Sequence, residues 1–77
     1  MNKARRKWLG EIIDKLEEQK MELDSLIEEE QEAYDNMPES LQDGERGQAM
    51  SDIINDLETE RDSIEDVMQN LLEILER

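Results

Sequence analysis

The fold is decided by the stretch Asn36-Met37-Pro38-Glu39-Ser40-Leu41-Gln42-Asp43-Gly44-Glu45-Arg46-Gly47, which lies near the middle of the 77-residue chain. It holds the only proline and two of the three glycines, the residues that most strongly interrupt regular structure. On each side run more than thirty residues without proline, with apolar side chains at helical spacing. The sequence therefore predicts an all-α fold, an antiparallel two-helix hairpin of coiled-coil type.

We expect a single helical-hairpin domain over residues 1–77, with a first helix over about 2–36, a turn over 37–44 and a second helix over about 45–76. At 1.5 Å per residue, each helix is roughly 50 Å long. One domain of this size buries only a thin core.

Side chains in the turn offer helix caps. Asn36, with Glu39 three residues later, predicts the N-cap of one short helical turn, and Asp43 predicts the N-cap of the second helix. Gly44 permits the change of direction between them. Gly47, in a first helical turn, costs about 1 kcal/mol relative to Ala. It therefore indicates either the close approach of another backbone or a ligand, or a plain loop residue.

Both halves carry the same three apolar columns. With Ile13 and Ile54 at heptad position a, positions a and d are mostly apolar, and position g is apolar as well. The g positions of an antiparallel pair flank the same side of the seam. They form one apolar strip, which consists of Ile12, Leu26, Ala33, Ile53, Val67 and Ile74. A lone hairpin cannot bury this strip, so we expect a homodimer that closes into a four-helix bundle.

One polar layer interrupts the apolar seam. If the turn centres near residue 41, facing residues sum to about 80 to 82, and between the layers of Leu9 and Ile27 only one fails to match apolar with apolar. It contains Lys20 and Arg61 at a, with Gln19 and Glu60 at g. The layer is either a lock on the register, with Gln19 and Glu60 satisfying the cations, or a site for a small anionic ligand between the copies of a dimer.

The composition leaves little chemistry for catalysis. The chain has no cysteine and no histidine, so its serines and threonine lack a histidine base, and thiolate or imidazole metal ligands are missing. Glu28, Glu29, Glu30 and Glu32 are interpreted as a solvated acidic face. We expect no enzymatic activity, no cofactor and no metal.

The charge is strongly negative and unevenly placed. The formal charge is −14, and residues 3–7 contribute +4, so the other residues sum to −18. This balance disfavours direct binding to nucleic acids or anionic membranes and favours a basic protein partner. Antiparallel pairing brings the basic segment beside Glu73 and Glu76, and we expect it to act as their counterion. Trp8, off the main seam, either covers the open end of the bundle or is an exposed contact residue.

No apolar run is long enough for a membrane span, and the absence of cysteine is typical of a cytoplasmic protein.

The turn also resembles a motif in small acidic helical proteins of phages and mobile elements, of the approximate pattern N-[LIM]-P-E-[SN]-L-Q-x-S-E-R. The matching residues are Asn36, Pro38, Glu39, Leu41, Gln42, Glu45 and Arg46. The motif covers about a fifth of the chain, and Gly44 departs from it where serine is expected, which removes a helix cap. The resemblance implies a phage-derived protein that acts inside a bacterium.

The sequence features predict a non-enzymatic, oligomerising interaction protein. The resemblance implies that such a protein acts by stoichiometric binding, as an inhibitor of a host defence factor. Two alternatives remain. The acidic helices could mimic DNA and inhibit a nucleic-acid-binding protein, or the chain could be a sponge that binds a nucleotide signal through the cationic layer or Arg46.

Overall fold

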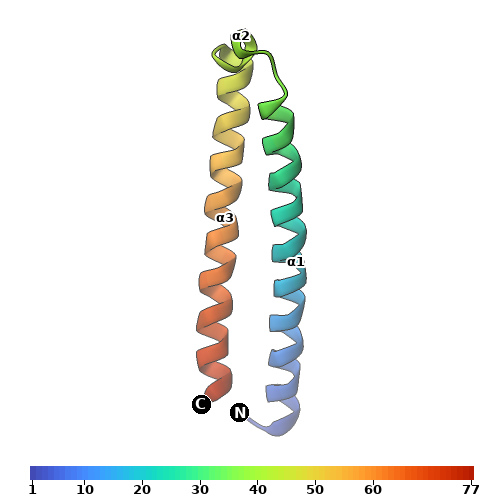
Figure 1. The fold of residues 1–77 in the computed structure, drawn as a ribbon. Coiled ribbons are helices and arrows are strands. Elements are labelled where there is room, and N and C mark those ends of the chain that lie inside the picture. Colours follow the sequence, from blue (N-terminus) through green and yellow to red (C-terminus); the bar gives the residue numbers. More distant parts are fainter.

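The computed structural model describes all residues 1–77, and its fold is an elongated helical hairpin (Figure 1). Two long helices, α1 (Lys3–Asp35) and α3 (Glu45–Glu76), run antiparallel, and the four-residue α2 (Glu39–Gln42) lies at the turn. Both termini lie at the end opposite the turn. The molecule measures 58 × 15 × 12 Å. The predicted all-α hairpin is confirmed.

The two long helices lie within a residue or two of their predicted bounds. α1 begins after Asn2, whose side-chain oxygen accepts a hydrogen bond from the Arg5 backbone N–H at 2.8 Å and so satisfies one of the free donors of the first turn. α3 begins at Glu45, whose carboxylate is favourable beside the positive end of the helix dipole.

The predicted N-caps in the turn are wrong by one or two residues. Asn36 ends α1, because its N–H donates to the Glu32 carbonyl at 3.0 Å, and the N-cap of α2 is Pro38. In the same way the Asp43 N–H donates to the Glu39 carbonyl at 3.2 Å, so Asp43 ends α2. Both side chains follow a helix that is still hydrogen-bonded, and neither is placed to cap the next one.

Gly44 is the N-cap of α3 and supplies no side-chain cap. This agrees with its departure from the turn motif, which has serine there. Its φ of −87° and ψ of −176° are extended values that any residue adopts, and no residue in the chain has a positive φ. The reversal of the chain therefore uses no glycine-specific backbone conformation.

Gln42 and Gly47 hold the turn together. The Gln42 side-chain amide donates to the carbonyls of Tyr34 at 2.8 Å and Met37 at 3.1 Å, which ties α2 to the end of α1. Gly47 is buried, and a Cβ built there would overlap the Gln42 carbonyl and lie 2.5 Å from the Gln42 Cα. Of the two interpretations of Gly47, the close approach of another backbone is the observed one.

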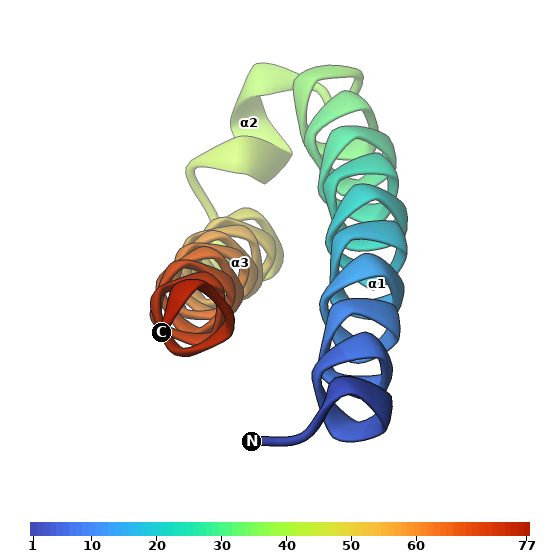
Figure 2. The same ribbon diagram turned by 90° about the horizontal axis from the view of Figure 1, so that it is seen from below.

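The core is thin and lies to one side of the seam. The four buried apolar residues, Ile13, Ile27, Ile54 and Met68, are all at heptad position a. The d residues, such as Leu16, are only half-buried. Position d lies next to g and position a next to e. The helices therefore close against each other on the e flank and leave the d and g side open. Figure 2 shows α1 and α3 as a single pair, with α2 only at the turn end.

Candidate interaction surfaces

The g flank of the hairpin is an exposed apolar strip. Ile12, Leu26, Ile53, Val67 and Ile74 each expose between 39% and 51% of their surface, and Ala33 is exposed with them. They come alternately from α1 and α3, because the same column of the heptad faces one side in both helices. The prediction that a lone hairpin leaves this strip uncovered is confirmed. Scattered apolar residues are common on surfaces, whereas these lie in one column on one side of the hairpin, which makes the strip a candidate interaction surface.

The e flank is polar and carries the ion pairs that bridge the helices. Lys20 Nζ lies 3.1 Å from Glu65 Oε2, and Arg61 Nη1 lies 3.5 Å from Asp24 Oδ1. Both carboxylates occupy e positions. Exposed pairs of this kind contribute little to stability. They do show which way the two cations point, which is away from the apolar strip.

The polar layer therefore has partners other than the predicted ones. Gln19 and Glu60 form no hydrogen bond or ion pair with the cations. Both are exposed on the g flank, where they divide the apolar strip into two halves. Arg61 takes Asp62 as a second partner, with Nη2 3.2 Å from Oδ1. On the opposite helix, Lys20 and Arg61 reach carboxylates about one turn beyond the layer, because their side chains are long. The layer thus presents no unpaired cation to an anionic ligand.

These contacts shift the pKa values of two side chains on the e flank, Glu65 and Lys20. The Gln69 amide donates to Glu65 at 3.1 Å, and together with Lys20 it lowers the pKa of the Glu65 carboxyl. The hydrogen bond to Glu65 and its charge raise the pKa of Lys20. Both groups remain charged at neutral pH, so the bridge persists under physiological conditions.

The open end is held differently from the prediction. Arg6 Nη1 donates to the backbone carbonyl of Leu75, and neither Glu73 nor Glu76 forms an ion pair. The last carbonyls of a helix have no partner within the helix, so they compete with carboxylates for a nearby guanidinium. Trp8 exposes 63% of its surface, and within one chain it does not cover the end.

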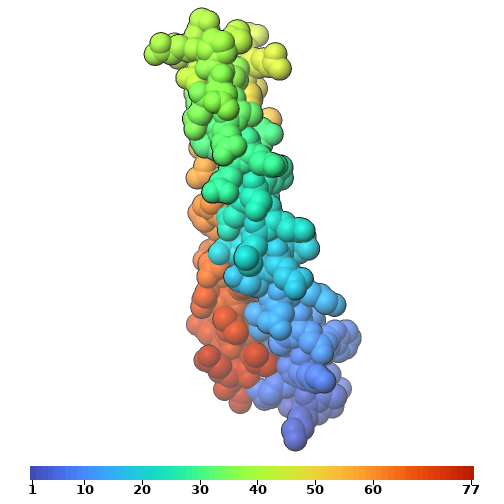
Figure 3. All heavy atoms as spheres, turned by 45° about the vertical axis from the view of Figure 1, so that its right-hand side comes forward, coloured from blue at the N-terminus to red at the C-terminus, as the bar shows by residue number.

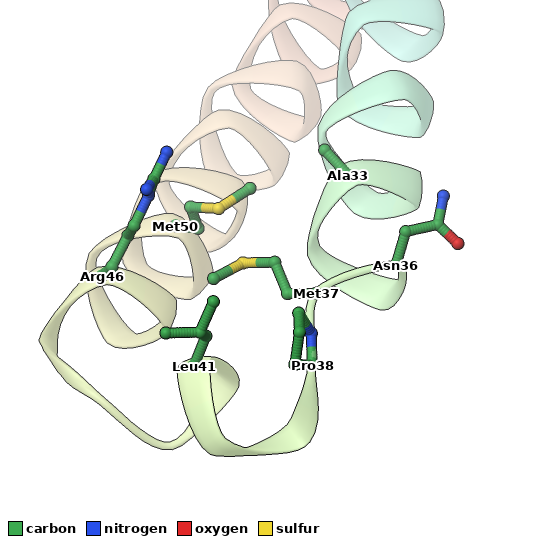
Figure 4. Close-up of a pocket in the computed structure, with 7 residues that line it drawn as sticks. All are labelled: Ala33, Asn36, Met37, Pro38, Leu41, Arg46 and Met50. Carbon is green, nitrogen blue, oxygen red and sulfur yellow. The ribbon is translucent and has the colours of Figure 1, made fainter.

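A hollow of about 350 Å³ lies at the turn (Figure 4). Met37, Pro38 and Leu41 line it from the turn, and Met50 closes it from α3. Ala33 borders it from α1, Arg46 extends along its rim, and the Asn36 side chain points away from it. We call this hollow the turn pocket. Sequence analysis missed the turn pocket, because it forms only when α2 packs at the end of α3. Its only sequence signals are Met37 within the turn motif and Met50 shortly after it.

No group of acidic side chains in the structure converges as a metal ion would require. No helix combines the length and the apolar character that crossing a membrane demands. Comparison with known proteins gives no further assignment, since no protein-family model, curated protein or solved structure matches this chain.

Proposed function

We propose that the chain is a non-enzymatic interaction protein that dimerises through the apolar strip into a four-helix bundle and acts by binding a macromolecule stoichiometrically. The observation that carries the proposal is the one-sided core. Full burial is confined to position a, while the d residues are half-buried and the g residues exposed.

A four-helix bundle accounts for this gradient. In such a bundle each helix faces two neighbours, and the residues midway between them point at the bundle axis. For a helix with an a, d and g stripe, that midway position is d. A second hairpin placed on the g flank would cover d and g together, and would leave the ion pairs of Lys20 and Arg61 on the outer flank.

The isolated hairpin also has too little core to be expected to stand alone. Only four apolar side chains are buried in 77 residues, with no disulfide to supplement them. Small chains of this kind use oligomerisation as a remedy. A two-fold axis hides the same strip on both copies and leaves no strip free for further growth.

The dimer presents its acidic outer surface to a partner. The charge of −14 per chain favours a protein partner with a basic surface and disfavours nucleic acid or anionic lipid. The turn motif resembles phage proteins, and on that basis we propose a bacterial host as the setting and a host defence factor as the target.

Size-exclusion chromatography with light scattering tests the assembly. We expect twice the mass of one chain at micromolar concentration, and a mass of one chain at that concentration would overturn the proposed dimer. Affinity capture from the bacterial host then tests the binding function. The control is a variant with the same net charge in which polar residues replace apolar residues of the strip. Capture of no host protein by the intact dimer would overturn that function.

The acidic surface favours one second candidate, a DNA mimic. Carboxylates exposed along both rigid helices resemble the phosphates of a duplex in sign and repetition. This candidate requires salt-sensitive binding to the basic channel of a nuclease or repressor, and the absence of such binding at low salt would reject it. A nucleotide sponge has weaker support, because Lys20 and Arg61 already pair with carboxylates. Calorimetry with cyclic dinucleotides tests whether the chain binds a nucleotide signal through Arg46.

A further inference from the structure

We propose that Trp8 of each chain inserts into the turn pocket of a second copy, in a dimer whose two turns lie at opposite ends. This inference rests on the proposed dimer and adds its orientation and its anchor. It joins two features that a single chain leaves unused, an exposed aromatic side chain at one end of the rod and an apolar hollow at the other.

The turn pocket suits an aromatic side chain. Its volume of about 350 Å³ lies at the small end of the range for binding pockets, and its walls are mostly apolar. Leu41 exposes 48% of its surface there without a partner. Met37 and Met50 are flexible and polarisable, and methionine sulfur makes favourable contacts with aromatic rings. Arg46 has no ion-pair partner in the structure, and its position on the rim allows it to stack on an indole.

Trp8 and the turn pocket lie on the same flank. Trp8 is at heptad position c, which is adjacent to g on the helix surface and thus borders the apolar strip. Ala33 and Arg46, which line the turn pocket, are themselves at position g. A second hairpin that covers the strip therefore passes over both features.

The two features are also nearly equidistant from the polar layer. Trp8 precedes Lys20 by 12 residues and Ala33 follows it by 13, which corresponds to about 18 and 20 Å along the helix. A two-fold axis that is perpendicular to the rod and passes through this layer brings Trp8 of one chain opposite Ala33 of the other. The tryptophan side chain leans toward its own N-terminus, which carries it further toward the partner's turn.

Charge favours the same orientation. Residues 3–7 carry +4, whereas residues 35–46 carry −3, with four carboxylates against Arg46. With turns at opposite ends, the basic segment of each chain lies beside the acidic turn of the other. With turns at the same end, the two basic segments lie at one end and the two acidic turns at the other. Complementary charge of this kind selects between alternative registers.

The chain provides its own reporter, because Trp8 is the only tryptophan. We expect its fluorescence to shift to shorter wavelength as the concentration rises through the dimer dissociation constant. Leu41→Glu is expected to abolish the shift and to weaken the dimer about tenfold or more, as loss of an aromatic anchor's pocket does. Met21→Glu is the matched control, since Met21 is 61% exposed but lies at position b, away from the strip.

The outcomes separate the two proposals. A dimer by light scattering whose Trp8 emission stays that of an exposed indole, or a Leu41→Glu variant with unchanged emission, would overturn the inference and leave the proposed dimer standing. A monomer at all accessible concentrations would overturn both.

A cysteine test reads the orientation directly, because the natural chain has no cysteine. With turns at opposite ends, Gln19 lies beside its own copy near the axis, so Gln19→Cys should form a disulfide dimer on mild oxidation. With turns at the same end, Gln19 faces Glu60 of the other chain. Cross-linking only in a mixture of Gln19→Cys and Glu60→Cys chains would overturn the inference.

Discussion

The two flanks of this hairpin differ although both are built from the same two helices. The e flank carries the carboxylates Asp24 and Glu65, which bridge the helices through Arg61 and Lys20. The g flank has no ion pair, and most of its side chains are apolar and exposed. Figure 3 shows the narrow rod that the two helices form. Position e thus contributes to the contact between the two helices, whereas position g remains exposed.

This difference teaches that the position of burial is more informative than its amount. A symmetric two-stranded seam would bury a and d alike. Here full burial is limited to position a, and the d residues remain half-exposed toward the g flank. The asymmetry is our reason for proposing a further helix layer on the g flank, and it makes the flanks separable by mutation.

The largest expected effect comes from a charge on the open flank. Ile53→Glu places one uncompensated carboxylate from each chain in the proposed interface, at a total cost of about 3 kcal/mol for the dimer, so the dissociation constant should rise about a hundredfold. Sedimentation equilibrium measures it. Ser51→Glu is the control, because it adds the same charge two residues away on the e flank. Equal effects of both variants would remove the distinction between the flanks.

The turn joins the two helices, so a defect there should lower the stability of the whole hairpin and not of one flank alone. Gly47→Ala forces a Cβ against the Gln42 backbone and should lower the free energy of unfolding by about 1–3 kcal/mol in urea denaturation. Gly10→Ala is the matched control. Nothing lies within 4 Å of a Cβ at Gly10, and the substitution should stabilise the helix by about 1 kcal/mol. A stabilised Gly47→Ala variant would contradict the close backbone approach.

Completing the apolar strip should sharpen the contrast. The double substitution Gln19→Leu and Glu60→Leu removes the polar break in the g flank, and we expect the dimer to tighten about tenfold, as replacement of buried polar groups by apolar ones often does. The dimers with turns at opposite ends and at the same end should become more equal in stability, because the polar layer no longer distinguishes between them. Analytical ultracentrifugation gives the affinity. A weaker dimer would mean that the strip is not the interface.

The smallest effect is expected on the e flank. Lys20 and Gln69 lower the pKa of Glu65, so its interactions stabilise the folded chain above the ordinary carboxyl pKa and are lost as the pH falls through the lowered value. Glu65→Gln should therefore melt a few degrees below the natural chain at pH 7, and the difference should vanish in acid. Glu18→Gln, at an exposed position without a partner, is the control for the change in net charge.

The hairpin and its open strip were predictable from the sequence. Pro38 lies between two uninterrupted stretches of helical periodicity, and an apolar column such as Val67 and Ile74 repeats every seven residues without a place in a two-stranded seam. Periodicity fixes which face a residue occupies. It does not require knowledge of any contact, which is why these features could be read before the structure.

The details that were wrong or missed depend on contacts. Asn36 and Asp43 suit either end of a helix, and which end they occupy depends on whether the preceding helix still holds their N–H. Lys20 and Arg61 pair with carboxylates that their long side chains can reach on the opposite helix, and not with residues of their own layer. The turn pocket depends on the path of α2, which no periodic pattern encodes. Arg6 likewise donates to the carbonyl of Leu75 and not to a carboxylate of Glu73 or Glu76.

Both ends of the chain lie together, far from the turn, in a rod 58 Å long. A fluorescent label fused to either terminus therefore marks the same tip of the molecule. In a dimer with turns at opposite ends, donor and acceptor labels on two copies sit at distant tips and exchange energy poorly. In a dimer with turns at the same end they lie close and exchange it well, so the arrangement can be measured without altering a single side chain.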